Sequence, residues 1–469
     1  MRCKRRPGGA SASAFRRCAL GALVSVIACT ELESRDDFFG YDASVLATSP
    51  FNRPHDGGSS EPSAIAGCLP TGDRPALILG QAGEPMELDQ DTAWTCRFNY
   101  VLQSPLVVTP GATLAIGPDT RISSGRSVFI LIQRGARLLA EGARDAPVVF
   151  TSSQPIGQRA PGDWRGLMLA GNAPSHATNG LIPSTLNDAR ASFGGGPEGD
   201  AQHDCGSLRY VRVEFAGAAT DEESTPLSAV SLAGCGAATQ VDYLQVHRAT
   251  DGLGLFGGTV AIKHVVVSNN GFGDAIEWTG GYTGAMQYVV AQSAGAAAAL
   301  KGSNADSDPG LAPVSHPSIY NATIVGIRPA IPSGNHFGLL LQLGSSATLK
   351  NSIVTNFDDA AIDLRSAPTL AAVSSAHISH LLLHDNGPNG TTHFTLAAAR
   401  LTDQTSRDRD PGLKAAARRE NPDFRPTQAA VSSDIAATRA GFDPAATYRG
   451  AVPFQGDDWT LGWTRYPLD

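Results

Sequence analysis

Apolar and polar residues alternate over short segments that recur along this chain, most clearly between residues 241 and 303. Three segments there, VDYLQVHRATDGLGLFGG, AIKHVVVSNNGFGDAIEWTGG and MQYVVAQSAGAAAALKGS, each pair a strand pattern with a turn and a second apolar run. Their third positions, Tyr243, His264 and Tyr288, are 21 and 24 residues apart. This period is typical of one coil of a parallel β-helix. We therefore expect an all-β fold, a right-handed parallel β-helix of roughly nine to eleven coils.

The same strand pattern recurs outside this stretch. Seven strands begin at Leu208, Val241, Ile262, Met286, Ile319, Leu349 and Ile378. Earlier, the segment GATL at Gly111 returns as GARL at Gly135, 24 residues on. Residues 174–205 leave the pattern, and an excursion of that length from a solenoid is expected to lie over one face.

These patterns divide the chain into consecutive parts. We predict an N-terminal cap over residues 76–105, the parallel β-helix over 106–384 and a C-terminal cap over 385–469, because a solenoid needs its open ends covered. The C-terminal cap is expected to pack back on the last coils, with Trp459 and Trp463 as apolar anchors.

The first 28 residues combine basic residues with an apolar run from Ala19 to Ala28, and we predict a lipoprotein signal peptide over 1–28. The ending Val-Ile-Ala-Cys resembles a bacterial lipobox, so Cys29 is the predicted lipidation site, with a flexible tether over 29–75. Thr30 favours export to the outer membrane or cell surface. The alternative is an ordinary cleaved signal in which Cys29 is incidental.

Charge and composition exclude one class of partner. The 469-residue chain has a formal net charge of −8, and its first 28 residues hold six basic and no acidic side chains. A mature chain without them carries −14, so nucleic acid is not an expected partner.

Four cysteines follow Cys29, namely Cys68, Cys96, Cys205 and Cys235, an even number in an oxidising compartment. Three pairings are open to four cysteines, and proximity favours Cys68 with Cys96 and Cys205 with Cys235. The second bridge would join equivalent turns of neighbouring coils.

Candidate chemistry gathers on the second strands of the repeat. Aligning them by their turns sets Gly254, Glu277 and Lys301 at one level. Asp251 and Asp274 stand three positions earlier in the first two of these coils, and Asp363 stands at the matching place further on. Carboxylates and an ammonium group in neighbouring coils contain the parts of a polysaccharide lyase or hydrolase. The alternative is a solvated salt bridge between Glu277 and Lys301, which contributes little.

Two further sets of residues invite a functional interpretation. The third position of the repeat forms a column of rings and amides, which we interpret as a stabilising ladder, with a sugar-stacking platform as the alternative; it comprises Tyr210, Tyr243, His264, Tyr288, Asn321, Asn351 and His380. Asp358 and Asp359 offer a weak calcium site at a turn. No other cofactor is expected.

The segments GATLAIGPDTRI, SFGGGPEGDAQHDCGSLRYVRVEFAG and TYRGAVPFQGDDWTLGWTRYP resemble secreted parallel β-helix lipoproteins of Gram-negative bacteria. The resemblance covers residues 85–469 and implies fold and location more firmly than activity. Where relatives carry paired acids in the turns, this chain has Thr250-Asp251 and Gly273-Asp274, which weakens the case for a cation site there.

The sequence thus favours a non-enzymatic cell-surface lipoprotein, a glycan- or protein-binding, adhesion or structural module. Its expected partners are the outer membrane, through the lipid, and a polysaccharide or surface protein. The alternative function is a polysaccharide lyase or glycoside hydrolase that uses Asp251, Asp274, Glu277 and Lys301 along the flank of the β-helix.

Overall fold

A computed structural model describes residues 68–81, 83–182, 189–217, 228–271, 273–295, 297–328, 335–399, 401, 406–407, 409–427 and 435–469. All of these lie in one compact unit, Pro62–Asp469. The predicted signal peptide, Cys29 and most of the predicted tether lie outside the described residues.

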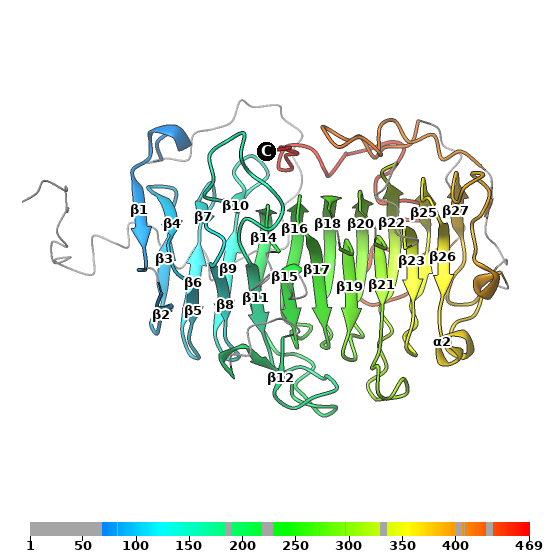
Figure 1. Ribbon diagram of the computed structural model, residues 1–469, viewed down its shortest axis with the longest axis horizontal. Helices are drawn as coiled ribbons and strands as arrows, with labels where there is room; N and C mark the ends of the chain where they lie inside the picture. Colours follow the sequence, from blue (N-terminus) through cyan, green and yellow to red (C-terminus); the bar gives the residue numbers. More distant parts are fainter. Residues whose placement is uncertain are drawn as a thin grey trace, which may run out of the picture. The chain divides into compact units, whose positions relative to one another are not determined.

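Within this unit the chain forms a right-handed parallel β-helix, with strands stacked side by side along one axis (Figure 1). One face is a ten-stranded parallel sheet, which means ten coils in the described part of the chain. Its strands, in spatial order, are β2 (Met86–Leu88), β5 (Leu106–Val108), β8 (Phe129–Ile132), β11 (Gly166–Ala170), β15 (Ser228–Ala233), β17 (Asp251–Phe256), β19 (Ile276–Thr279), β21 (Leu300–Gly302), β23 (Phe337–Leu341) and β26 (Ala360–Leu364).

The other faces of the coils belong to a sixteen-stranded sheet. Its strands are β1 (Ala76–Leu79), β3 (Thr92–Trp94), β4 (Asn99–Leu102), β6 (Thr113–Ile116), β7 (Arg121–Ser124), β9 (Arg137–Glu141), β10 (Val148–Ser152), β14 (Gly206–Glu214), β16 (Gln240–His247), β18 (Ala261–Asn270), β20 (Ala285–Ser293), β22 (Ser318–Gly326), β24 (Thr348–Lys350), β25 (Ser352–Thr355), β27 (Leu381–His384) and β28 (Ser406–Arg407). The strand starts read from the sequence are in register, because Leu208, Val241, Ile262, Met286, Ile319, Leu349 and Ile378 pair in succession.

A change in coil shape occurs at β14. In earlier coils a turn separates two short strands, so that β9 and β10 are distinct, and both pair with halves of β14. From β14 onward a single left-handed residue replaces that turn. All seven predicted ladder residues occupy this position with φ between 48° and 61°. Asparagine tolerates this conformation best among residues with a side chain, which accounts for part of the column's composition.

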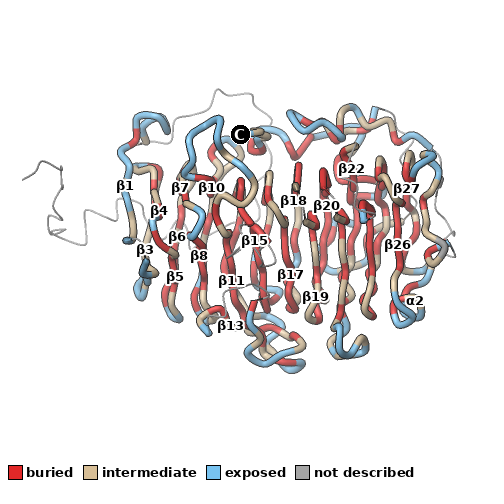
Figure 2. The backbone as a smooth tube through the Cα atoms, in the orientation of Figure 1, coloured by how far each residue is buried: buried red, intermediate tan, exposed pale blue. Residues whose placement is uncertain are grey.

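The interior of the coils is filled by the alternate apolar residues of every strand, and Figure 2 shows the buried positions following the strands. Residues such as Leu138, Leu208, Val241, Ile262 and Met286 are fully or almost fully buried. Stacking is what buries them, because one coil alone has no interior.

The segment assigned to an N-terminal cap contributes a coil of its own. Strands β1, β2 and β3 pair in parallel with β4, β5 and β6 respectively. Trp94 stacks on Tyr100 inside this coil, with ring centroids 4.6 Å apart.

The excursion after β11 covers the outer side of the ten-stranded sheet, as expected. It carries the two-stranded antiparallel pair β12 (Gly180–Leu181) and β13 (Ser192–Phe193) and the short helix η2 (Ala189–Ala191). Ile182 and Phe193 pack against Met168, Leu131 and Phe256 on that sheet.

The C-terminal part packs differently from the prediction. Phe394 and Leu401 close the last coil, together with the helix α2 (Ala367–Ala372) and the short helix η3 (Leu396–Ala398). Residues 435–469, here called the C-terminal strap, run back over the sixteen-stranded sheet to its middle (Figure 1). The prediction that Trp459 and Trp463 pack on the last coils was wrong, because the open surface that they cover is the aromatic column at β14 to β18.

Two disulfides join neighbouring segments. Cys68 pairs with Cys96, and Cys205 with Cys235, at Cα separations of 5.5 and 5.7 Å. The pairing favoured by proximity is therefore the one in the structure. The short helix η1 (Thr71–Asp73) lies beside the first bridge. Among the described residues there is no helix of the length and apolarity that a bilayer crossing requires.

Candidate functional site

The predicted site residues come together on three adjacent strands of the ten-stranded sheet, β17, β19 and β21. Glu277 lies between Gly254 and Lys301 in the strand register, as the turn alignment predicted. Glu277 is flanked by Ile276 and Trp278, which point into the core, so its own side chain points outward. Asp274 lies at the turn just before β19 and Asp251 begins β17, so both carboxylates lie at the same end of the sheet.

The lysine of this cluster pairs with a different carboxylate from the one expected. Lys301 Nζ lies 2.7 Å from Asp274 Oδ2, and the backbone N–H of Ala298 donates to Asp274 Oδ1 at 3.0 Å. The expected salt bridge between Glu277 and Lys301 is absent from the described contacts. The Asp274 side chain is only 8% exposed and that of Lys301 31%, so the pair is not a fully solvated one.

Glu277 is held from the other side by a hydroxyl. Ser228 Oγ, on β15, donates to Glu277 Oε1 at 3.1 Å and reaches over the intervening strand β17. Gly254 on β17 makes this possible, because a Cβ atom there would lie 2.5 Å from Ser228 Oγ. Sequence alignment of the repeats missed Ser228, since the residues before it do not follow the repeat pattern. The glycine at position 254 of an otherwise apolar strand was the one available signal.

Asp251 contributes an unsatisfied oxygen to the cluster. Its Oδ1 is buried and has no hydrogen-bond partner among the described residues. Gly273 lies against it, and a Cβ atom at that position would overlap this oxygen. Burial raises the pKa of Asp251 well above its ordinary value, and the nearby carboxylates of Glu277 and Asp274 raise it further.

Burial and the neighbouring charges also shift the pKa values of Glu277 and Lys301. Burial, followed by repulsion from Asp274, raises the pKa of Glu277, while Lys301 and the Ser228 hydrogen bond oppose the rise. For Lys301 burial by itself lowers the pKa, but Asp274, Glu277 and Asp251 outweigh it and the pKa rises. The lysine therefore stays charged, while Glu277 and Asp251 hold protons to higher pH than free carboxyls do.

The cluster thus combines a fixed ion pair with two proton-holding carboxyls. Asp274 is bound by the Lys301 ammonium group and by the backbone N–H of Ala298. Glu277 is half-buried, with one oxygen receiving a hydroxyl hydrogen bond and the other free to carry a proton. When two carboxyl groups of one site lie in different environments, one can act as a general acid and the other as a general base.

The remaining candidates lie elsewhere. Asp363 stands in the same column as Glu277 and Lys301, beyond Leu340, and pairs with Arg365 and Thr395. Asp358 pairs with Arg328 and His336, and Asp359 accepts the backbone N–H of His336. Across the described ranges no three His, Cys, Asp or Glu side chains converge in a way that would hold a metal ion.

The column of rings is covered by the C-terminal strap. Tyr210, Tyr243, His264 and Tyr288 stack with centroids 4.3 to 4.8 Å apart, and Trp463 and Trp459 pack edge-on against the first three. A ring covered in this way has no face left for a sugar. The structure therefore supports the stabilising ladder.

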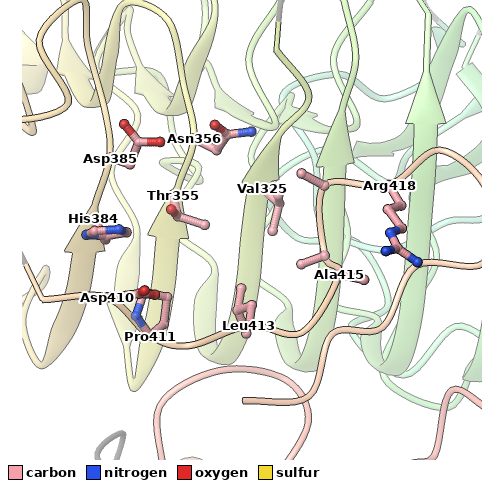
Figure 3. A pocket seen from close by; sticks show the side chains of 12 residues that line it. Val325, Thr355, Asn356, His384, Asp385, Asp410, Pro411, Leu413, Ala415 and Arg418 are labelled. Atoms are coloured by element: carbon pink, nitrogen blue, oxygen red, sulfur yellow. The ribbon is translucent and has the colours of Figure 1, made fainter. Parts of the chain in front are cut away.

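A separate cavity of about 370 Å³ lies between strands β22, β25 and β27 and residues 410–418 (Figure 3). Its polar lining is already engaged, since Asp385 pairs with Arg328, and Asp410 accepts the backbone N–H of Gly412. None of the predicted site residues lines it.

A comparison with known protein families complements this geometry. The pectate-lyase-like β-helix domain matches residues 86–464, which is most of the chain. The chain belongs to the pectate-lyase-like β-helix domain family. Searches among curated proteins and among solved structures gave no match. In this member of the pectate-lyase-like β-helix family, the acidic cluster lies on the outer side of the ten-stranded sheet, beside the excursion at 174–205.

Proposed function

We propose that this protein is a glycoside hydrolase that cleaves a polysaccharide bound on the outer side of the ten-stranded sheet. The observation that carries the proposal is the cluster of Asp251, Asp274 and Glu277 around Lys301, in which two carboxyls have raised pKa values. Membership of the pectate-lyase-like β-helix family supports a polysaccharide as the substrate class.

In this proposal Glu277 is the general acid and Asp274 the general base. Glu277 transfers its proton to the glycosidic oxygen as the bond to the anomeric carbon breaks. A water molecule attacks that carbon and gives its proton to Asp274. Lys301 and the Ala298 amide hold the Asp274 carboxyl oriented before the attack. Burial and the negative charge of Asp274 raise the pKa of Glu277, so that Glu277 keeps its proton.

Charge favours hydrolysis over elimination. A lyase that acts on a uronate needs a free positive group to neutralise the sugar carboxylate. Lys301 is the cation that lies in this cluster, and Asp274 already compensates it. With Lys301 compensated by Asp274, the cluster offers no free positive charge to an acidic sugar ring, so a neutral polysaccharide is the preferred substrate.

The test is incubation of the mature chain with neutral and acidic polysaccharides, with assays for new reducing ends and for unsaturated ends. We expect reducing ends without unsaturated ends, and a loss of about 10²- to 10⁴-fold in kcat for Glu277→Gln. The matched control is Glu87→Gln, because Glu87 occupies the same outward column six strands earlier and pairs with Arg190.

Three results would overturn the proposal. Unsaturated ends would identify a lyase, and equal losses in Glu277→Gln and Glu87→Gln would show that the effect is not local. Polysaccharide binding without turnover would instead support the non-enzymatic binding module favoured by the sequence.

We further propose that the domain is held at the outer membrane by an acyl chain on Cys29. The support is the basic leader, the apolar run and the lipobox-like ending at residues 26–29. Radiolabelled palmitate should enter the wild-type chain during growth and not Cys29→Ala. Equal labelling of both chains would contradict the proposal.

A further inference from the structure

Three arginines converge on the outer side of the sixteen-stranded sheet, on a different face from the acidic cluster. Arg121 on β7 and Arg212 on β14 are in register with Val149 on the strand between them. Two strand spacings separate their Cα atoms by about 9.5 Å. Arg159, from the segment between β10 and β11, adds a third positive charge, whose repulsion contributes to lowering the pKa of Arg121.

The positive charge of this group is only partly compensated. Arg212 donates through Nε to Oε1 of the buried Glu214 at 3.0 Å, and Arg159 donates through Nε to the backbone oxygen of Gln154. The guanidinium of Arg121 makes no hydrogen bond and no ion pair with any residue that the structure describes. In the part of the chain that the structure describes, Arg212 is the one of these three arginines that pairs with Glu214, so the positive charge of the group exceeds the negative charge bound to it.

The other acids nearby are directed elsewhere. Glu214 also accepts a hydrogen bond from Thr151, and Asp163 accepts from Ser152 and from the amide of Ala160. The side chain of Asp469 approaches Gly157 and interacts with Arg248. None of these acids forms an ion pair with Arg121 or Arg159.

The electrostatic cost of this arrangement appears at Arg121. Burial lowers its pKa, and the like charges of Arg159 and Arg212 lower it further against the pull of Glu214. The chain has a net charge of −8, but these three guanidinium groups make the local charge positive. An anion placed between Arg121 and Arg212 would relieve that repulsion.

The shape of the site indicates what kind of anion fits. Val149 forms an apolar floor that is 8% exposed, and Arg121 and Arg212 stand on either side of it. Guanidinium groups bind planar carboxylates and sulfates through paired hydrogen bonds. A sugar ring that carries such a group offers an apolar C–H face to the floor and an oxyanion to the arginines.

We propose that Arg121, Arg159 and Arg212 form a binding site for the carboxylate or sulfate group of an acidic saccharide. This site is separate from the hydrolytic cluster and does not depend on it. Its ligand differs in charge from the neutral polysaccharide proposed as substrate.

The test measures affinity of the full mature chain for polygalacturonate, dextran sulfate and uncharged dextran at low and high salt. We expect binding to one or both acidic polymers, weakened by salt, and no binding to dextran. Arg121→Gln and Arg159→Gln should each weaken binding roughly tenfold, because each removes a charge-assisted hydrogen bond. Arg212 is left unchanged, because its loss would strand the buried Glu214.

The matched control is Arg97→Gln, an exposed arginine of the first coil, which should bind as the wild type does. Equal weakening by Arg97→Gln would reveal non-specific attraction and overturn the site. Retention of inorganic phosphate or of anionic lipid vesicles, without either acidic polymer, would overturn the saccharide assignment. Glu277→Gln should leave this binding unchanged, so failure of the proposed hydrolysis does not decide the outcome here.

Discussion

Asp251 illustrates at the level of one residue how a functional cluster costs stability. Its Oδ1 is buried without a partner, and two other carboxyls lie close by. A surface acid would relax away from such neighbours, but Gly273 and the start of β17 hold this one in place. Unsatisfied buried groups that a fold retains are typical of sites where a ligand completes the contacts.

The raised pKa of Asp251 leads to a prediction about stability and pH. The folded protein holds this proton more tightly than the unfolded chain does, so stability falls as pH rises from the unfolded pKa, about 3.9, toward the folded value. Asp251→Asn removes this loss. We expect its melting temperature to exceed that of the wild type at neutral pH and the difference to shrink below about pH 4. Thermal unfolding across pH measures this, and an equal or lower melting temperature at neutral pH would contradict the account.

At the level of the element, the left-handed residue between paired strands determines the shape of the later coils. Tyr210, Tyr243, His264, Tyr288, Asn321, Asn351 and His380 all adopt it. In β14, β16, β18, β20 and β22 the left-handed residue lies within one long strand that passes from one face to the next without a loop, whereas Asn351 and His380 occupy the same position beside shorter strands. The four rings from Tyr210 to Tyr288 stack on each other, and Asn321 holds the strap by donating to the backbone oxygens of Ala446 and Tyr448.

His380, with φ of 57°, tests the importance of this conformation. His380→Asn should retain stability, because asparagine enters the left-handed region readily. His380→Val should cost about 1–2 kcal/mol, because a β-branched side chain clashes with its own backbone there. Urea unfolding of both variants gives the comparison, and equal free energies of unfolding would show that the conformation is not limiting.

At the level of the whole molecule, the C-terminal strap ties distant coils together. Gln245 pairs through both amide atoms with the backbone of Arg465, and Gln287 pairs likewise with Asp443. Arg144, between β9 and β10, binds the Asp457 carboxylate through both terminal nitrogens. A repeat protein contacts only its neighbouring coils otherwise, so these contacts extend cooperativity across several coils.

Trp463 is the apolar anchor of that strap and is fully buried against Tyr210 and Tyr243. Trp463→Ala should lower the free energy of unfolding by about 3–5 kcal/mol. The control is Leu461→Ala on the same segment, where the side chain is 52% exposed and the expected change is small. Chemical denaturation measures both, and similar losses in the two variants would show that the strap is not anchored at Trp463.

The sequence by itself determined the β-helix, the register of its strands and the level of Glu277 and Lys301. Each follows from a period of about two dozen residues and from alternation along a strand, which the chain carries locally. Tertiary structure alone decided that Lys301 pairs with Asp274, that Ser228 reaches Glu277 across Gly254, and that the strap covers the middle coils. Those contacts depend on turns and on segments outside the repeat, whose paths are set by packing against coils distant in sequence and not by any local pattern.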